Sequence, residues 1–276
     1  DVQTLRLSDQ VTLISIQPPC GSNTYVFSQE GKLTLLDTGF AVYEKEMDAL
    51  FRRLFPGWEE IPKDVYITHA DVDHCGLLGK LPNAVTYMNE KSASNLALQY
   101  QGLPDYREQR NFCFGYSKLS RIISGYQPID PSLIRVIDRD TPKEHAHLLK
   151  IGELAIADVT LEIFEGSGGH MYGEMVFISK QHRIAFTGDN LVNISGFSPE
   201  RAEFNSLAPY LMTTVNIHSQ RARDMRREVT QRILDIEEES GLACTVCGGH
   251  GPISVMEGSK LVTAEDTEGK GRSAEK

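Results

Sequence analysis

Long apolar runs are missing from this sequence of 276 residues, and no segment has the length and hydrophobicity that a bilayer requires. No signal peptide is recognisable at its start. Cysteine is scarce. The five cysteines are an odd number at scattered positions, and they do not form the pattern of a disulfide framework. We therefore expect no membrane partner and a reducing, cytoplasmic location.

Positive charge is also in short supply. The chain has 28 Lys and Arg against 38 Asp and Glu, which gives a formal net charge of -10. An acidic protein is a poor match for the phosphates of nucleic acid, so nucleic acid is not an expected partner. The expected partner is a small-molecule substrate, and a homodimer is left open.

Apolar runs of four to six residues alternate with turns and with two longer amphipathic stretches. This pattern predicts an α/β fold in which helices pack on mixed sheets. The strands are expected at 11–16, 23–27, 32–36, 65–67, 85–88, 133–137, 159–164, 174–178, 183–187 and 243–246, and the helices at 43–55 and 220–239.

The chain is expected to form a single domain over residues 1–258. Residues 90–131 differ from the rest in being rich in Tyr, Phe, Arg and Gln, and they predict a mostly helical insertion that roofs the site. The small polar residues of 259–276 predict a disordered tail.

The most informative segment is a group of four metal-binding side chains directly after the apolar run 65–67. His69, Asp71, Asp73 and His74 fall within six residues. Two carboxylates and two imidazoles at the end of a strand are costly to bury together unless a cation lies between them. The cluster therefore predicts a metal site.

Three further candidates follow later strands in glycine-rich contexts, namely His170 after Gly168-Gly169, Asp189 after Thr187-Gly188, and His250 between Gly249 and Gly251. A lone His or Asp in a loop is more often solvated than ligating, so these three depend on the wider pattern. The remaining histidines that lack such a context are expected at the surface: His145, His147, His182 and His218.

Taken together, these motifs resemble the metallo-β-lactamase-fold superfamily. Its usual motif is His-x-His-x-Asp-His followed by a His, an Asp and a final His. Here the first motif reads His69-x-Asp71-x-Asp73-His74, and the resemblance extends over about residues 11–255. It implies a four-layer αββα sandwich with the site at one edge of the two sheets.

The resemblance also implies a site for two divalent metal ions. His69, Asp71 and His170 would hold the first metal, Asp73, His74 and His250 the second, and Asp189 would bridge them. A water or hydroxide would lie between the two ions, and Asp73 and Asp189 are the expected catalytic residues.

Asp71 departs from the motif, because most hydrolases of the family carry His at that position. Three carboxylates and one hydroxide would cancel the charge of two divalent ions, whereas the His version would keep one positive charge. The harder oxygen ligand shifts the expected metal from zinc toward iron or manganese. Flavodiiron proteins, whose motif is otherwise similar, carry an acidic residue there.

Two functions follow. The first is a hydrolase that attacks an ester, thioester, lactone or phosphoester, and the absence of a flavodoxin-like domain from this sequence favours it. The second is a di-iron protein that reduces or senses oxygen or nitric oxide, which Asp71 favours. A binding module with a degenerate site is a third reading, disfavoured because every ligand position holds a metal-binding residue.

Two further features have competing interpretations. Arg107, Arg110 and Arg121 of the insertion predict an anionic substrate, unless the aromatic residues around them simply pack the insertion onto the body. Cys244 and Cys247 form a lone CxxC, which is weak evidence for redox chemistry and more typical of small residues in a buried strand.

Overall fold

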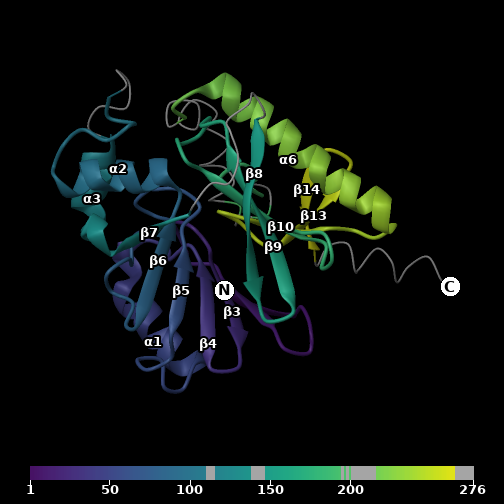
Figure 1. Cartoon of the computed structure of the whole chain (residues 1–276), viewed down its shortest axis with the longest axis horizontal. Helices are drawn as coiled ribbons and strands as arrows, with labels where there is room; N and C mark the ends of the chain where they lie inside the picture. The colour runs from purple at the N-terminus through teal and green to yellow at the C-terminus, as the bar shows by residue number, and fades with distance from the viewer. Residues whose placement is uncertain (110–115, 138–146, 194–195, 197–198, 200–215, 265–276) are drawn as a thin grey trace.

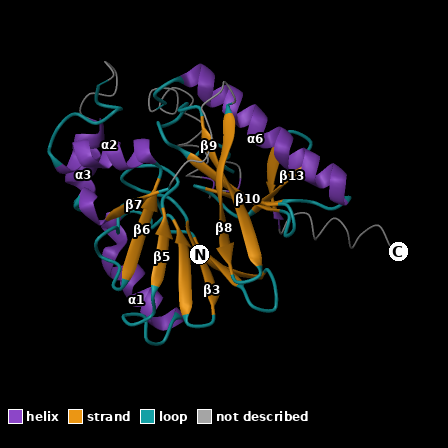
Figure 2. Ribbon diagram, in the orientation of Figure 1, coloured by secondary structure: helices purple, strands orange, loops and turns teal. Residues whose placement is uncertain are grey.

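Two seven-stranded sheets lie face to face in this computed structural model, with helices on both outer sides (Figure 1). The structure describes residues 1–109, 116–137, 147–193, 196, 199 and 216–264. Figure 2 shows the resulting order of layers, which is helix, sheet, sheet and helix. The predicted αββα sandwich is thereby confirmed.

The first sheet follows chain order from one edge to the other. Its strands are β1 (Val2–Arg6), β2 (Thr12–Ile16), β3 (Thr24–Gln29), β4 (Lys32–Leu36), β5 (Lys63–Tyr66), β6 (Ala84–Met88) and β7 (Ile134–Val136). Strands β1 to β4 are antiparallel, whereas β4 to β7 run parallel. Parallel strands require crossover connections, and α1 (Glu44–Leu54) lies in the connection from β4 to β5, whereas α2 (Glu90–Tyr100) and α3 (Tyr116–Ser124) lie in the connection from β6 to β7.

The second sheet contains β8 (Leu148–Ile156), β9 (Val159–Gly166), β10 (Met175–Ser179), β11 (Ile184–Gly188), β12 (Thr245–Gly248), β13 (Ser254–Glu257) and β14 (Lys260–Thr263). All neighbouring strands in it are antiparallel except β11 and β12. That parallel pair is joined through α6 (Ser219–Ser240), the long helix that crosses the outer face of the sheet in Figure 1.

The apolar core has three layers, which correspond to the three interfaces of the sandwich. Phe27 of β3 and Phe186 of β11 meet between the sheets with their ring centroids 5.2 Å apart. Outside the first sheet, Phe51 of α1 packs in a second cluster. Outside the second sheet, Val229 and Ile233 of α6 pack in a third. Each sheet therefore buries both faces, which explains the nearly continuous apolar strands in the sequence.

Helix α6 begins and ends at recognisable signals. His218 precedes it, and its Nδ1 accepts a hydrogen bond from the backbone N–H of Arg221. Gly241 follows it with a φ of 68°, a left-handed conformation that glycine adopts without steric cost. Among the described residues, no helix is both long and apolar enough to cross a membrane.

The structure contains strands that the sequence pattern did not predict, namely β1, β8, β13 and β14. The last of these corrects the expected disordered tail, because Lys260–Thr263 pairs in an antiparallel register with β13. Residues 265–276 lie outside the described residues. Between β6 and β7 the chain forms α2, α3 and a short 3-10 turn (Pro131–Leu133), so the segment 90–131 is mostly helical as predicted where it is described.

Candidate metal centre

The predicted ligands converge at one edge of the sandwich because they all follow the ends of strands. His69, Asp71, Asp73 and His74 lie in the turn after β5. His170 lies between β9 and β10, whereas Asp189 and His250 follow the parallel strands β11 and β12. Backbone hydrogen bonds tie the two sheets together here, since Met175 N donates to Thr68 O and Asn23 N donates to Gly249 O.

Among the described residues, two groups of three side chains could each hold a metal ion. His69, His170 and Asp189 form one group, and Asp73, His74 and His250 form the other. Within each group, the candidate ligand atoms lie within 4.8 Å of one another. The second group contains the three residues predicted for the second metal, whereas the first contains His69 and His170 with Asp189 in place of Asp71.

Asp189 lies between the two groups and presents one carboxylate oxygen to each. Its Oδ1 lies 3.2 Å from His74 Nε2 and 3.3 Å from His250 Nε2. Its Oδ2 lies 3.5 Å from His170 Nε2 and 4.0 Å from His69 Nε2. A carboxylate in this position can join two cations through separate oxygens, as a bridging ligand does.

The four imidazoles present Nε2 to the centre because a polar group faces each Nδ1. Thr68 Oγ1 lies 3.0 Å from His69 Nδ1, and Asp37 Oδ2 lies 2.8 Å from His74 Nδ1. The two other contacts, each at Nδ1, are His170 with Asn216 Oδ1 at 2.9 Å and His250 with Gly21 O at 3.0 Å. Such partners set the ring orientation, and an acceptor among them leaves Nε2 unprotonated for a metal.

Asp37 is the most heavily used of these supporting groups. Its Oδ1 accepts the backbone N–H of Thr68 at 2.7 Å, and its Oδ2 accepts the Thr68 hydroxyl at 2.8 Å in addition to facing His74. The residue has a φ of 58°, in the left-handed region. Aspartate tolerates that region better than most residues do, which suits it to the sharp turn after β4.

The charges at the centre strongly perturb two ionisable groups. Burial by itself lowers the pKa of the His74 imidazole, but the carboxylates of Asp189 and Asp37 raise that pKa well above its usual value. Burial likewise raises the pKa of Asp189, yet the imidazoles of His250 and His74 hold it well below its usual range. Mutual dependence of this kind, in a buried group of opposite charges, is typical of a functional site.

The donor set fits two metal ions. His69 Nε2, His74 Nε2 and Asp189 Oδ1 are buried without a hydrogen-bond partner, although buried polar atoms are normally satisfied. Cations at the two sites would satisfy all three atoms. Four imidazoles and three carboxylates provide the mixture of nitrogen and oxygen ligands that zinc, iron and manganese accept.

The backbone approaches the centre closely at Gly249, which precedes the last histidine of the set. A Cβ at this position would lie 2.3 Å from Asp189 Oδ1 and 2.9 Å from His74 Cε1. Only glycine therefore leaves room for the Asp189 carboxylate, which gives the Gly-Gly-His sequence at 248–250 a steric reason.

The arginine prediction requires a correction. Arg107 is only 2% exposed, and its guanidinium pairs with both oxygens of Asp71 instead of facing a substrate pocket. Arg121 is partly buried, donates to Gln99 O and lies near Glu108. Arg110 lies outside the described residues. A partner for Asp71 had no sequence signal, because 36 residues separate it from Arg107.

The two cysteines of the CxxC motif face opposite sides of the second sheet. Cys244 packs with the core under α6, whereas Cys247 packs between the sheets. Both are free thiols. Their side chains point apart, so the pair lacks the geometry of a disulfide and fits the interpretation as small buried strand residues.

Other candidates from the sequence lie away from the centre. His218 caps α6, and His147 lies 3.4 Å from the Ser167 hydroxyl. His182 is partly buried rather than fully at the surface. His145 lies outside the described residues. None of the three described histidines belongs to the two ligand groups.

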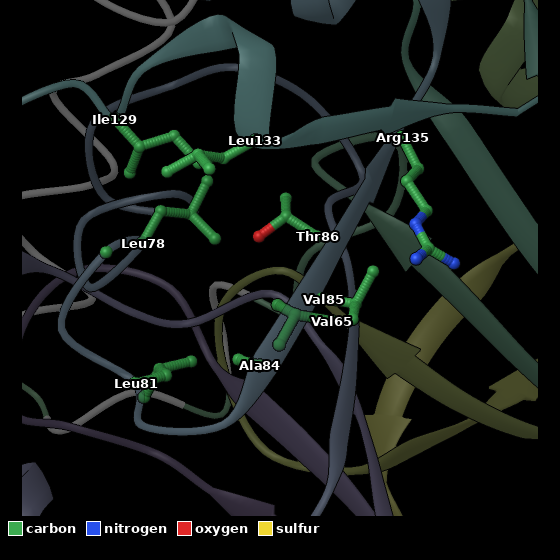
Figure 3. A pocket seen from close by; sticks show the side chains of 10 residues that line it. Val65, Leu78, Leu81, Ala84, Val85, Thr86, Ile129, Leu133 and Arg135 are labelled. Carbon is green, nitrogen blue, oxygen red and sulfur yellow. The ribbon is translucent and has the colours of Figure 1, made fainter.

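A separate cavity of about 280 Å³ lies beside β5, β6 and β7 (Figure 3). Val65, Val85, Leu78 and Ile129 contribute apolar walls, and Arg135 lies at one side. No candidate metal ligand lines it, so this cavity is distinct from the metal centre.

Comparison with known proteins agrees with this architecture. A sequence profile described as the metallo-beta-lactamase superfamily matches residues 17–250. A search of curated proteins found no match. The chain belongs to the metallo-beta-lactamase superfamily.

Solved structures with the same fold are distant in sequence. The chain is similar to a metallo-beta-lactamase from Pontibacter korlensis, with 14% identity, a TM-score of 0.52, and coverage of 92% of this chain and 93% of that one. It is similar to the hydrolase AbOPH of the beta lactamase superfamily at 14% identity, a TM-score of 0.54, and coverage of 95% and 97%. It is also similar to the apo chemotaxis sensor ODP from T. denticola at 14% identity, a TM-score of 0.54, and coverage of 98% and 91%. Identities this low establish the fold alone.

Proposed function

We propose that the chain is a metal-dependent hydrolase with a binuclear centre, acting on an ester, thioester, lactone or phosphoester. The observation that carries the proposal is the position of Asp189, whose two oxygens face two separate groups of ligands. Two divalent ions, of zinc or of iron or manganese, would supply an activated water and polarise the bond to be cleaved. The substrate is a small molecule, and an anionic one remains a prediction.

The exposed side of the centre indicates where a substrate would approach. Asp73 and His250 are the most accessible ligands, with 25% and 20% of their side chains exposed, whereas His69 and His74 are almost completely buried. Asp73 Oδ2 lies 3.4 Å from His250 Nε2. We assign to Asp73 the orientation of the attacking water and to Asp189 the separation of the two ions.

The test combines metal analysis with a substrate panel. Purified protein should contain two divalent ions and should hydrolyse one class of ester, thioester, lactone or phosphodiester. A chelator should abolish the activity, and added metal should restore it. Asp73→Asn should lower kcat by roughly 10²–10⁴-fold if the carboxylate orients or deprotonates the water. Asp224→Asn on α6 is the matched control. A metal-loaded protein without activity toward any of these classes would contradict the proposal.

A second function has one observation in its favour, namely the carboxylate of Asp71 beside the first group of ligands. Its Oδ2 lies 3.1 Å from His170 Nε2 and 3.4 Å from His69 Nε2. Oxygen-rich ligand sets favour iron or manganese over zinc, so a di-iron protein that senses or reduces oxygen or nitric oxide is the alternative. Protein that contains two irons and gains visible absorption in air would support it, whereas zinc alone would exclude it.

A cytoplasmic location is part of the proposal. Its support is that Cys20, Cys75, Cys244 and Cys247 are free thiols, as expected in a reducing compartment. A homodimer stays a prediction.

A further inference from the structure

Arg107, in the segment between β6 and β7, has a charged side chain that reaches the metal centre. Arg107 Nη2 donates to Asp71 Oδ2 at 2.8 Å, and Nη1 donates to Asp71 Oδ1. Two parallel N–H···O bonds between a guanidinium and a carboxylate fix both the position and the plane of the carboxylate. The pair is withdrawn from solvent, since Arg107 is 2% exposed.

A buried polar network holds the turn that carries Arg107. Asp105 Oδ1 accepts the backbone N–H groups of Arg107 at 3.1 Å and of Glu108 at 2.9 Å. Asp105 Oδ2 accepts a hydrogen bond from Gln99 Nε2 of α2 at 3.0 Å. Asp105 and Gln99 are themselves buried. A long, flexible arginine side chain is therefore supported at its base by α2 and at its tip by Asp71.

The two oxygens of Asp71 have different surroundings. Oδ1 faces Arg107, whereas Oδ2 also lies 3.1 Å from His170 Nε2 and 3.4 Å from His69 Nε2. Only Oδ2 therefore points toward the first group of ligands. A carboxylate held in this way can offer a metal one oxygen, in the manner of a single imidazole nitrogen.

We propose that Arg107 is a positioning residue that makes Asp71 a one-oxygen, charge-compensated ligand of the first metal. The inference rests on the proposed binuclear centre and concerns how this chain completes it. It also explains why Arg107 is unsuited to binding substrate, because its guanidinium already holds a buried carboxylate.

The formal charge of the centre changes when Arg107 is included. Asp71, Asp73, Asp189 and a hydroxide would cancel the charge of two divalent ions. The buried guanidinium restores one positive charge, which is the net charge that a histidine at position 71 would leave without any arginine. Asp71 and Arg107 together thus leave the same net charge as a neutral histidine at position 71. Replacing either residue alone with an uncharged one would change that net charge.

This reasoning predicts the outcome of a double-mutant cycle. Asp71→His alone should lower the affinity for one of two zinc ions by roughly 10- to 100-fold, because it removes the carboxylate that compensates the Arg107 charge and leaves that positive charge beside the metal. Adding Arg107→Met should return that affinity to near the wild-type level. Arg121→Met in the same Asp71→His background is the matched control and should not restore it.

The measurements are competition with a chromophoric chelator, elemental analysis after dialysis, and the melting temperature of each metal-free protein. Zinc binding by Asp71→His at or above the wild-type affinity would overturn the inference, as would a double variant that stays impaired. Changes in melting temperature without any change in zinc affinity would also overturn it, because they would indicate a purely structural pair.

A second substitution keeps the test available if Asp71→His does not fold. Asp71→Asn preserves the shape of the side chain and removes its charge, and Arg107→Met should again raise zinc affinity in that background. Metal binding by the wild-type protein distinguishes a failure of the proposed function from a failure of the proposed role of Arg107. A wild type that binds no metal would refute the proposed function, whereas a wild type that binds two ions while Arg107→Met gives no rescue would refute only the role of Arg107.

Discussion

Replacing Asp37 with asparagine should weaken the second metal site with almost no change in shape. Asp37 Oδ1 would still accept the backbone N–H of Thr68, and the Thr68 hydroxyl can rotate to accept from the new amide. The amide cannot accept from His74 Nδ1, which lies 2.8 Å from Asp37 Oδ2. Either His74 moves its proton to Nε2, the atom that faces the metal, or two donors face each other.

The size of the effect follows from that single contact. A hydrogen bond to a charged group contributes about 1.5–3 kcal/mol, and losing a partner behind a metal-binding histidine costs roughly 10- to 100-fold in affinity. We therefore expect Asp37→Asn to lose one of two zinc ions at chelator concentrations that wild type withstands. The other ion, held through His69 and His170, should be less affected.

The assay is stepwise chelator competition with elemental analysis at each step. Asp130→Asn is a suitable control, because the Asp130 side chain accepts from Ser132 N at a short helix between β6 and β7 and touches no ligand. Circular dichroism of the metal-free proteins should show an unchanged fold. If Asp37→Asn binds both ions with wild-type affinity, the argument that Asp37 selects the His74 tautomer is wrong.

Three further predictions follow. Gly249→Ala should weaken metal binding, because its Cβ would lie 2.3 Å from Asp189 Oδ1. Gly152→Ala, with open space around it, should have no effect, and equal metal contents in the two variants would contradict this. Burial lowers the pKa of Lys63 to about 8 from 10.5, so between these pH values the unfolded chain binds more protons than the folded protein. The stability of wild type relative to Lys63→Met, measured by urea titration, should therefore increase as pH rises from 8 to 10.5. A constant difference in stability would refute this. Burial raises the pKa of Cys75 to about 12, so iodoacetamide at pH 8 should label the exposed Cys20 while Cys75 stays unlabelled in peptide maps, and rapid labelling of Cys75 would show that it is accessible.

The strands predicted from the sequence are those with continuous apolar runs. Of the four that were missed, β1, β8 and β14 are edge strands, and β13 pairs with β12 at the single position Val246–Ser254. In β8 the register shifts between Lys150 and Gly152, which interrupts the two-residue alternation that predicts a strand. In β1 only Gln3 and Leu5 are even partly buried, so a strand with so little apolar content resembles a loop. Edge strands depend on pairing with a neighbour, and pairing is not visible in local composition.

The candidate ligands could be picked out from the sequence because each follows a strand or lies within the six-residue cluster. The groups that face the Nδ1 atoms of the histidines were harder to predict. Asn216 faces His170 Nδ1, and Gly21 O faces His250 Nδ1, although neither has a local motif that marks it. These partners come from loops whose positions are set by the packing of the two sheets.

The sequence by itself determined which residues could bind metal, in what order they occur, and that they follow strand ends, because these properties depend on residue type and local spacing. It also showed that Asp71 breaks the family pattern. Only the tertiary structure decided what that departure means, by placing Arg107 against Asp71 across 36 residues of chain. Spacing along the chain does not specify which charged side chains become neighbours in the folded protein. In a buried site, those neighbours determine the local electrostatic potential.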